Sequence, residues 1–162
     1  MARTQFRQRR RAAAFRARVA KEIVDSEREY VTALSDCKTH FYEPMRSNKN
    51  ISDELLTQIF STHFDAILHL SVTLLADVEM RAANWTSRSC LGDVFAKIAG
   101  FLKVYTPFIE GFDASIRARQ ELSKRARHVV EQCESKAGGK HSLGSCKICF
   151  SRLIFYFIII LI

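Results

Sequence analysis

Proline and glycine are scarce in this chain, whose 162 residues include two prolines and six glycines. Since both residues mark turns and loops, their scarcity argues against a β-sandwich and against long disordered tracts. The five cysteines are an odd number and widely scattered, and the basic start is not followed by the apolar run of a secretory signal peptide. Free thiols in a reducing compartment, the cytoplasm, are therefore the simplest expectation.

The sequence also lacks a pattern for covalent catalysis or for metal binding. His63 and His69 are single histidines without acidic or cysteine partners at ligand spacing, which favours packing or surface roles. Cys146 and Cys149 have the spacing of half a zinc site, but no second pair accompanies them. We therefore expect no cofactor, no metal site and no covalent chemistry.

Positive charge dominates, since 25 lysines and arginines against 17 acidic residues give a net charge of +8. This balance favours contact with anionic surfaces, whether nucleic acid, acidic lipid or an acidic protein face. The run Arg7–Arg11, RQRRR, fits a nuclear address, a phosphate-binding arm, a lipid-surface patch or a solvated extension of a helix. Because the run lacks interleaved aromatics and a recognition motif, we expect no nucleic-acid partner.

The stretch Val19–Phe41 is predicted to form a long helix. Its apolar residues recur at steps of three, four and seven, which places them along one side: Val19, Ile23, Tyr30, Leu34, Cys37 and Phe41. Pro44 lies just beyond, where helices commonly end. The preceding alanines and arginines are good helix formers, so the helix can begin well before Val19.

One flank of this predicted helix carries polar residues that a partner could contact. Glu22 lies one turn before Ser26, so their side chains project from neighbouring positions. The pattern alone favours a solvent-facing Glu22 in an ion pair with a nearby lysine or arginine. Glu27 lies nearer the apolar stripe and is expected to brace the bundle rather than to contact a partner.

A second helix is expected to begin at an N-cap at Ser52 and to run to about Met80, since no proline or glycine interrupts it. In the connection that follows, Trp85 is predicted to be a core plug at one end of the bundle, because large aromatics dominate buried area.

A third helical region is expected over Cys90–Phe112, kinked or split near Val104 because Pro107 lacks an amide proton. Its predicted apolar face consists of Leu91, Val94, Phe95, Ile98, Phe101, Leu102 and Tyr105. A fourth helix is expected from Asp113 to about Glu134. Its arginines and lysines are expected to point mostly outward: Arg117, Arg119, Lys124, Arg125 and Arg127.

The composition changes at Ser135, where a basic, glycine-bearing linker precedes the apolar run from Ile148. As a helix this run would span about 22 Å, short of a hydrocarbon core of about 30 Å, and Arg152 interrupts it. A weak tail anchor, a strand packed on the bundle and an aberrant end from alternative exon use all remain open.

Three parts of the sequence resemble the Dbl-homology domain, the guanine-nucleotide exchange module for Rho-family GTPases. EIVDSEREYVTAL at Glu22–Leu34 is similar to that family's first conserved region, and CLGDVFAKIAGFLKVYTPFI at Cys90–Ile109 is similar to its second. The stretch that begins IFSTHFDAILHL at Ile59 is similar to the intervening helix. The resemblance covers about Ala17 to Glu134 and implies an all-α fold, an elongated helical bundle.

The resemblance also implies a function and a site. In this family the domain binds the switch regions of the GTPase, distorts the site for Mg²⁺ and nucleotide, and promotes release of GDP. Glu22 matches the glutamate of the first conserved region that engages switch I, and Ser26 matches a neighbouring hydroxyl on the same surface. Tyr30 and Leu34 match positions that face the bundle core.

The sequence departs from the family pattern near Glu134, where the third conserved region, with its basic-proline-arginine signature, is not found. We therefore expect three parts: a basic N-terminal extension (1–16), a partial Dbl-homology domain (17–134), and a divergent linker with an apolar C-terminal tail (135–162). Loss of part of the binding surface would weaken exchange.

Two alternatives to an exchange factor stay open. One is a non-catalytic helical module that binds a GTPase or another partner. The other is an interaction protein attached to anionic membrane through its basic N-terminus and apolar tail.

Overall fold

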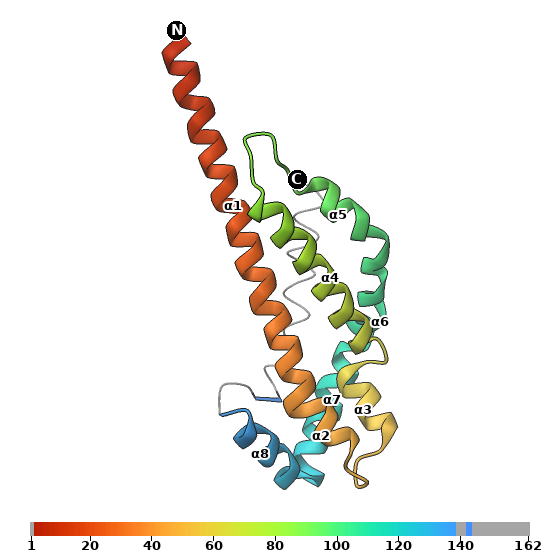
Figure 1. The fold of residues 1–162 in the computed structure, drawn as a ribbon. Helices are drawn as coiled ribbons and strands as arrows, with labels where there is room; N and C mark the ends of the chain where they lie inside the picture. The colour runs from red at the N-terminus through yellow and green to blue at the C-terminus, as the bar shows by residue number, and fades with distance from the viewer. Residues whose placement is uncertain (1, 139–141, 144–162) are drawn as a thin grey trace.

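The architecture is built along one long helix, α1 (Ala2–Cys37), in a computed structural model that describes residues 2–138 and 142–143. Among residues 6–37 of α1, Ala20 is the first that is buried, and residues 6–12 are all exposed. The N-terminal part of α1 consequently projects beyond the rest of the described chain (Figure 1). The prediction that the helix begins well before Val19 is confirmed.

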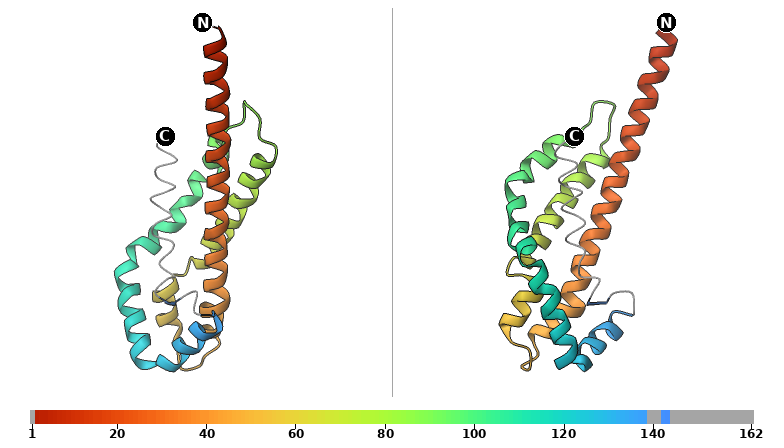
Figure 2. Two further views of the ribbon diagram at one scale, coloured as in Figure 1. Left: turned by 90° about the vertical axis from the view of Figure 1, so that its left-hand side faces the viewer. Right: turned by 180° about the vertical axis from the view of Figure 1, so that it is seen from behind.

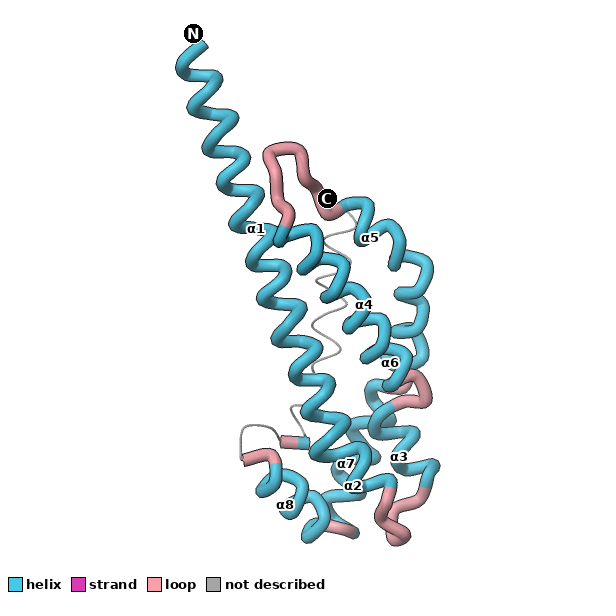
Figure 3. The backbone as a smooth tube through the Cα atoms, viewed as in Figure 1, coloured by secondary structure: helices cyan, strands magenta, loops and turns pink. Residues whose placement is uncertain are grey.

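All regular elements of the described chain are helical, and they form an elongated bundle (Figures 1 and 3). α4 (Phe64–Ala83) lies along α1, and α5 (Gly92–Ala99) packs on α4 from the other side. α3 (Asp53–Phe60) packs on α7 (Phe112–Arg125), and α8 (Arg127–Lys136) packs near the C-terminal end of α1 (Figure 2). The predicted all-α bundle is confirmed, and the apolar tail from residue 144 lies outside the described residues.

The chain does not end its helical path at Pro44, contrary to the prediction. A π-helical turn, η1 (Lys38–Tyr42), follows α1, and the backbone N–H of Glu43 donates to the carbonyl of Lys38, five residues back. The short helix α2 (Glu43–Arg46) then begins, with Pro44 in its first turn. Since proline clashes with the carbonyl four residues before it, this wider turn and the position in a first turn accommodate the ring.

The predicted single helix from Ser52 to about Met80 is wrong, because the chain breaks between α3 and α4. Ser52 caps α3 as predicted, and its Oγ accepts from the N–H of Leu55 at 3.3 Å. Ser61 ends α3 with a φ of 67°, a conformation that side-chain-bearing residues seldom adopt. The rings of Phe60 and Phe64, on either side of the break, pack 5.8 Å apart. Both rings also pack against the ring of Tyr42 in η1, with centroids 5.3 and 5.7 Å away, so tertiary packing accompanies a break that no proline or glycine marks.

The stretch Asp53–Ala83 also has the length and apolar composition of a membrane-crossing helix. The chain breaks at Ser61, however, and many of its apolar side chains are buried in the bundle, so core packing is a different reason for the apolar composition. These side chains supply much of the bundle core: Leu56, Ile59, Phe60, Phe64, Ile67, Leu74 and Val78.

The third helical region is divided as Pro107 predicted, into α5, the 3₁₀ segment η2 (Gly100–Tyr105) and α6 (Thr106–Glu110). The predicted apolar face is wrong for one residue, Phe101, which is 67% exposed. In a 3₁₀ helix, residues four apart are separated by about 120° around the axis rather than about 40°. With Tyr105 fully buried, Phe101 is therefore turned toward solvent.

Three further expectations are corrected by the structure. The predicted fourth helix is two helices, α7 and α8, which meet at Ala126. Arg119 is buried on α7 rather than outward, and it lines a hollow together with Val130 and Glu134 of α8. Trp85 is half-buried in the connection after α4 and is not a core plug.

A bidentate ion pair closes the connection between α4 and α5. The two terminal nitrogens of Arg81 donate to the two carboxylate oxygens of Asp93 at 2.8 and 2.6 Å, and Arg81 also donates to the carbonyl of Cys90. The hydrogen bonds and charge of Arg81 lower the pKa of Asp93 to about 2. The pair fixes the start of α5 relative to the end of α4.

Two valines of α4 give a matched test of the core. Val78 is fully buried, whereas Val72 is 45% exposed. Val78→Ala should lower the free energy of unfolding by about 2–3 kcal/mol, from lost transfer energy and the cavity left behind. Val72→Ala should change it by less than about 0.5 kcal/mol. Urea titration followed by circular dichroism measures both, and equal effects would contradict the assigned packing of α4.

The Arg81–Asp93 pair predicts an acid-sensitive contribution to stability. A carboxyl whose pKa is lower in the folded state contributes stability above its unfolded pKa, near 4, and loses it as pH falls toward about 2. Asp93→Asn should therefore flatten the fall in unfolding temperature between pH 4 and pH 2. Asp113→Asn, at an exposed aspartate of α7, is the control. A wild-type slope in Asp93→Asn would contradict the pairing.

Candidate functional site

Glu22 lies on the solvent side of α1, close to where the helix leaves the bundle. Its side chain is 69% exposed, and its carboxylate lies 3.8 Å from Nε of Arg18, one turn earlier. An exposed pair of this kind contributes at most about 1 kcal/mol to stability. The carboxylate can therefore exchange this intramolecular partner for an external donor at little cost.

The neighbouring residues divide between surface and core. Ser26, one turn after Glu22, is half-buried at the edge of the same flank. Glu27 is completely buried, in agreement with the prediction that it braces the bundle. Three residues further on, the Tyr30 hydroxyl lies 3.2 Å from that of Tyr105, which joins α1 to η2 in the core.

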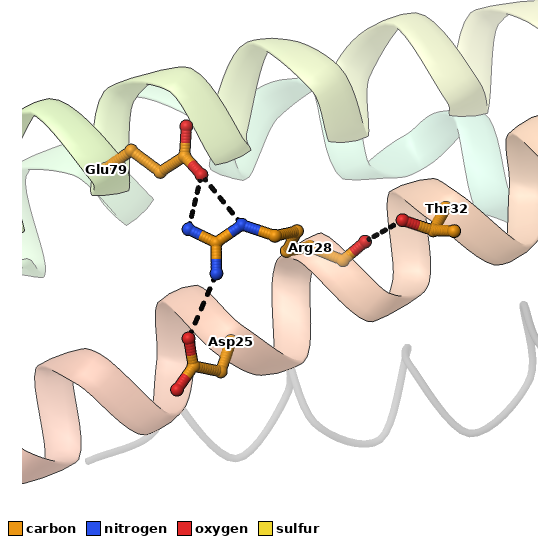
Figure 4. A network of polar contacts seen from close by, with 4 residues as sticks. All are labelled: Asp25, Arg28, Thr32 and Glu79. Atoms are coloured by element: carbon orange, nitrogen blue, oxygen red, sulfur yellow. Dashed lines mark hydrogen bonds and ion pairs between the residues drawn. The ribbon is translucent and has the colours of Figure 1, made fainter.

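A polar network joins α1 to α4 (Figure 4). Nε and Nη2 of Arg28 donate to Oε1 of Glu79 on α4, at 3.2 and 2.7 Å, and Nη1 donates to Asp25 at 3.0 Å. These bonds raise the pKa of Arg28, with the Glu79 hydrogen bond as the largest cause. Since Arg28 faces α4 and Glu27 faces the core, Glu22 is left facing outward.

The structure thus brings Glu22 and Ser26 together on one accessible flank, as the spacing predicted. Sequence reasoning did not single out Arg18, which contacts Glu22, or Arg28, which joins α1 to Glu79 of α4. The four-residue interval from Arg18 to Glu22 is a signal that could have identified the first. The contact from Arg28 to Glu79 joins residues 51 positions apart, and no local pattern could have found it.

Comparison with known proteins identifies the family. The profile described as the RhoGEF domain matches residues 19–152, which is most of the chain. The chain belongs to the RhoGEF family. The match begins at residue 19, within α1, includes the helical elements from there to α8, and extends past Glu134, where we placed the end of the partial domain.

Curated relatives agree with this assignment. FYVE, RhoGEF and PH domain-containing protein 4 from Rattus norvegicus is 29% identical over 125 residues, which are 74% of this chain and 16% of that protein. Guanine exchange factor for Rac 30 from Dictyostelium discoideum is 32% identical over 107 residues, 65% of this chain and 6% of that protein. Human FYVE, RhoGEF and PH domain-containing protein 6 is 29% identical over 113 residues, 66% of this chain and 8% of that protein. The chain therefore spans less than a fifth of the length of these relatives.

Truncation to alanine should destabilise the fold at Glu27 and leave its stability almost unchanged at Glu22, five positions earlier. Glu27→Ala should lower the free energy of unfolding by at least about 2 kcal/mol, because it opens a cavity and removes a buried polar group. Glu22→Ala should change it by less than about 0.5 kcal/mol, because the side chain is exposed. Thermal and urea unfolding measure both values. A large loss from Glu22→Ala would mean that the glutamate supports the fold rather than a partner.

Proposed function

We propose that this chain is a guanine-nucleotide exchange factor for Rho-family small GTPases, acting in the cytoplasm through the Glu22 flank of α1. Membership of the RhoGEF family supports the class of activity. The observation that carries the site is the exposure of Glu22, 69% at the side chain, at the position that resembles the family's switch-contacting glutamate.

The proposed mechanism needs no covalent step. A protein that binds the nucleotide-free GTPase more tightly than the nucleotide-loaded form weakens nucleotide binding by the same factor, since the two equilibria are linked. Glu22 would accept hydrogen bonds from backbone or hydroxyl donors of switch I. Charge-assisted bonds contribute about 1.5–3 kcal/mol, more than the exposed pair with Arg18 that they replace.

Ser26 has a secondary role in this proposal. Its half-buried hydroxyl lies one turn from Glu22, at the margin between the core and the exposed flank. There it would contact the GTPase at the edge of the interface, while Glu22 makes the central polar contact. The four-residue spacing keeps both residues on the same side of α1, whose opposite face is buried in the bundle.

A non-catalytic GTPase-binding module is the second candidate, since the sequence resembles the first and second conserved regions of the family but not the third. Binding without exchange would select it. Contact with anionic membrane through the basic N-terminus and the apolar tail is an alternative to this proposal and does not form part of it. The tail lies outside the described residues.

Exchange is tested by release of fluorescent GDP from Rho-, Rac- and Cdc42-type GTPases. We expect wild-type protein to accelerate release from at least one of them. Glu22→Ala should reduce the acceleration at least about ten-fold, the equivalent of losing one charge-assisted hydrogen bond.

Glu131→Ala is the matched control, because Glu131 is also an exposed glutamate in a pair with an arginine four residues earlier, Arg127, on α8. Its exchange rate should equal that of the wild type. If no GTPase releases nucleotide at high protein concentration, the exchange activity is refuted. If both glutamate variants behave alike, the assignment of the site is refuted.

A further inference from the structure

The flank of α1 that presents Glu22 and Ser26 continues toward the N-terminus as a line of exposed side chains. Arg7, Arg11, Phe15 and Arg18 precede Glu22 at intervals of four, four, three and four residues, the spacing of one face of a helix. We call these four residues the arginine stripe. All four are exposed, and α1 runs through them without a break.

Contacts within the stripe connect it to the proposed site. The guanidinium carbon of Arg18 lies 5.3 Å from the centre of the Phe15 ring, and Nε of Arg18 lies 3.8 Å from the Glu22 carboxylate. Phe15 nevertheless keeps 57% of its surface exposed. An exposed phenylalanine between arginines has the composition of a protein-interface anchor, since aromatics and arginine are enriched in such contacts.

The charge of this part of α1 defines the partner surface that would fit it. The first 21 residues contain seven arginines, one lysine and no acidic residue, so Glu22 is the first acidic residue of the chain. A complementary surface would be acidic, with an apolar patch for Phe15. From Arg7 to Arg18 the stripe spans about 16 Å at 1.5 Å per residue. A globular partner of 150–200 residues is about 40 Å across, so one seated on Glu22 would reach the stripe.

We propose that the arginine stripe is a second part of the GTPase interface and selects GTPases that carry an acidic surface beside switch I. This inference rests on the proposed function, because it places the GTPase on Glu22. Charged residues at an interface mainly accelerate association and discriminate between partners. The stripe would therefore determine which GTPase is captured, while Glu22 acts on its switch region.

The geometry favours a protein partner over a membrane surface. A helix that lies in a lipid interface needs its apolar side chains on one face. The two exposed aromatics of this segment, Phe6 and Phe15, are nine residues apart and so point to opposite sides of α1. Arg16 donates to the carbonyl of Ser87 in the connection after α4, which commits another side of the helix to the protein itself.

The test compares two double variants that remove the same charge from different faces of one segment. Arg7→Gln with Arg11→Gln removes two members of the stripe, and Arg9→Gln with Arg16→Gln removes two arginines that lie on the opposite side of the helix. Binding to nucleotide-free Rho-, Rac- and Cdc42-type GTPases is followed by stopped-flow fluorescence at low and high salt. The stripe variant should associate at least about five-fold more slowly at low salt, and the control less than two-fold. Phe15→Ala should instead accelerate dissociation.

Separate readouts distinguish this inference from the proposed function. If wild-type protein binds a GTPase but does not release its nucleotide, exchange is refuted, and the association rates of the two variants still decide the role of the stripe. Equal losses in the two double variants would show an effect of bulk charge and overturn the inference. It is also overturned if the stripe variant loses binding only to phosphatidylserine vesicles or to RNA, or if no GTPase binds the wild type.

Discussion

Packing of α1 against α4 is the interaction on which the rest of this structure depends. Ala20, Val24, Tyr30 and Leu34 are buried along α1, and Ile67, Leu74 and Val78 are buried along α4. From residue 6 onward, burial on α1 begins at Ala20, so the helix is packed in the bundle over its C-terminal part and leaves it toward the N-terminus. A helix that is packed in the bundle over one part of its length can present residues to a partner without losing further conformational freedom.

The rotation of α1 decides which chemistry faces outward. Arg28 is bonded to Glu79 of α4 and Glu27 is buried, so the intervening geometry turns Glu22 to solvent. Two glutamates of the same segment therefore serve different purposes, one within the core and one on the surface. A different rotation would bury Glu22 and expose Glu27, and the proposed contact with switch I would not form.

Much of this arrangement could be predicted from local sequence. The repeat of apolar residues predicted α1, the Ser52 cap predicted the start of α3, and Pro107 predicted the division of the third helical region. The failures share a physical cause, which is that tertiary packing overrides a local rule. Ser61 breaks a helix without proline or glycine, where the buried rings of Phe60 and Phe64 pack against Tyr42 of η1. Phe101 is exposed because the backbone tightens into a 3₁₀ segment, which changes the period on which the prediction depended.

The candidate site also contains some features that local sequence could predict and others that depend on tertiary contacts. Glu22 and Ser26 could be chosen from their spacing and their resemblance to the RhoGEF family. The contact between Arg28 and Glu79, which joins α1 to α4 beside these residues, could not be predicted, because it links residues 51 positions apart.

Hydrogen–deuterium exchange of this protein, with and without a nucleotide-free Rho-family GTPase, tests the central claim most directly. We expect the GTPase to protect the backbone amides of α1 around Glu22 and Ser26, with protection extending toward Arg7. Protection confined to the groove between α4 and η2, which Leu70, Ile98 and Phe101 line, would contradict the claim.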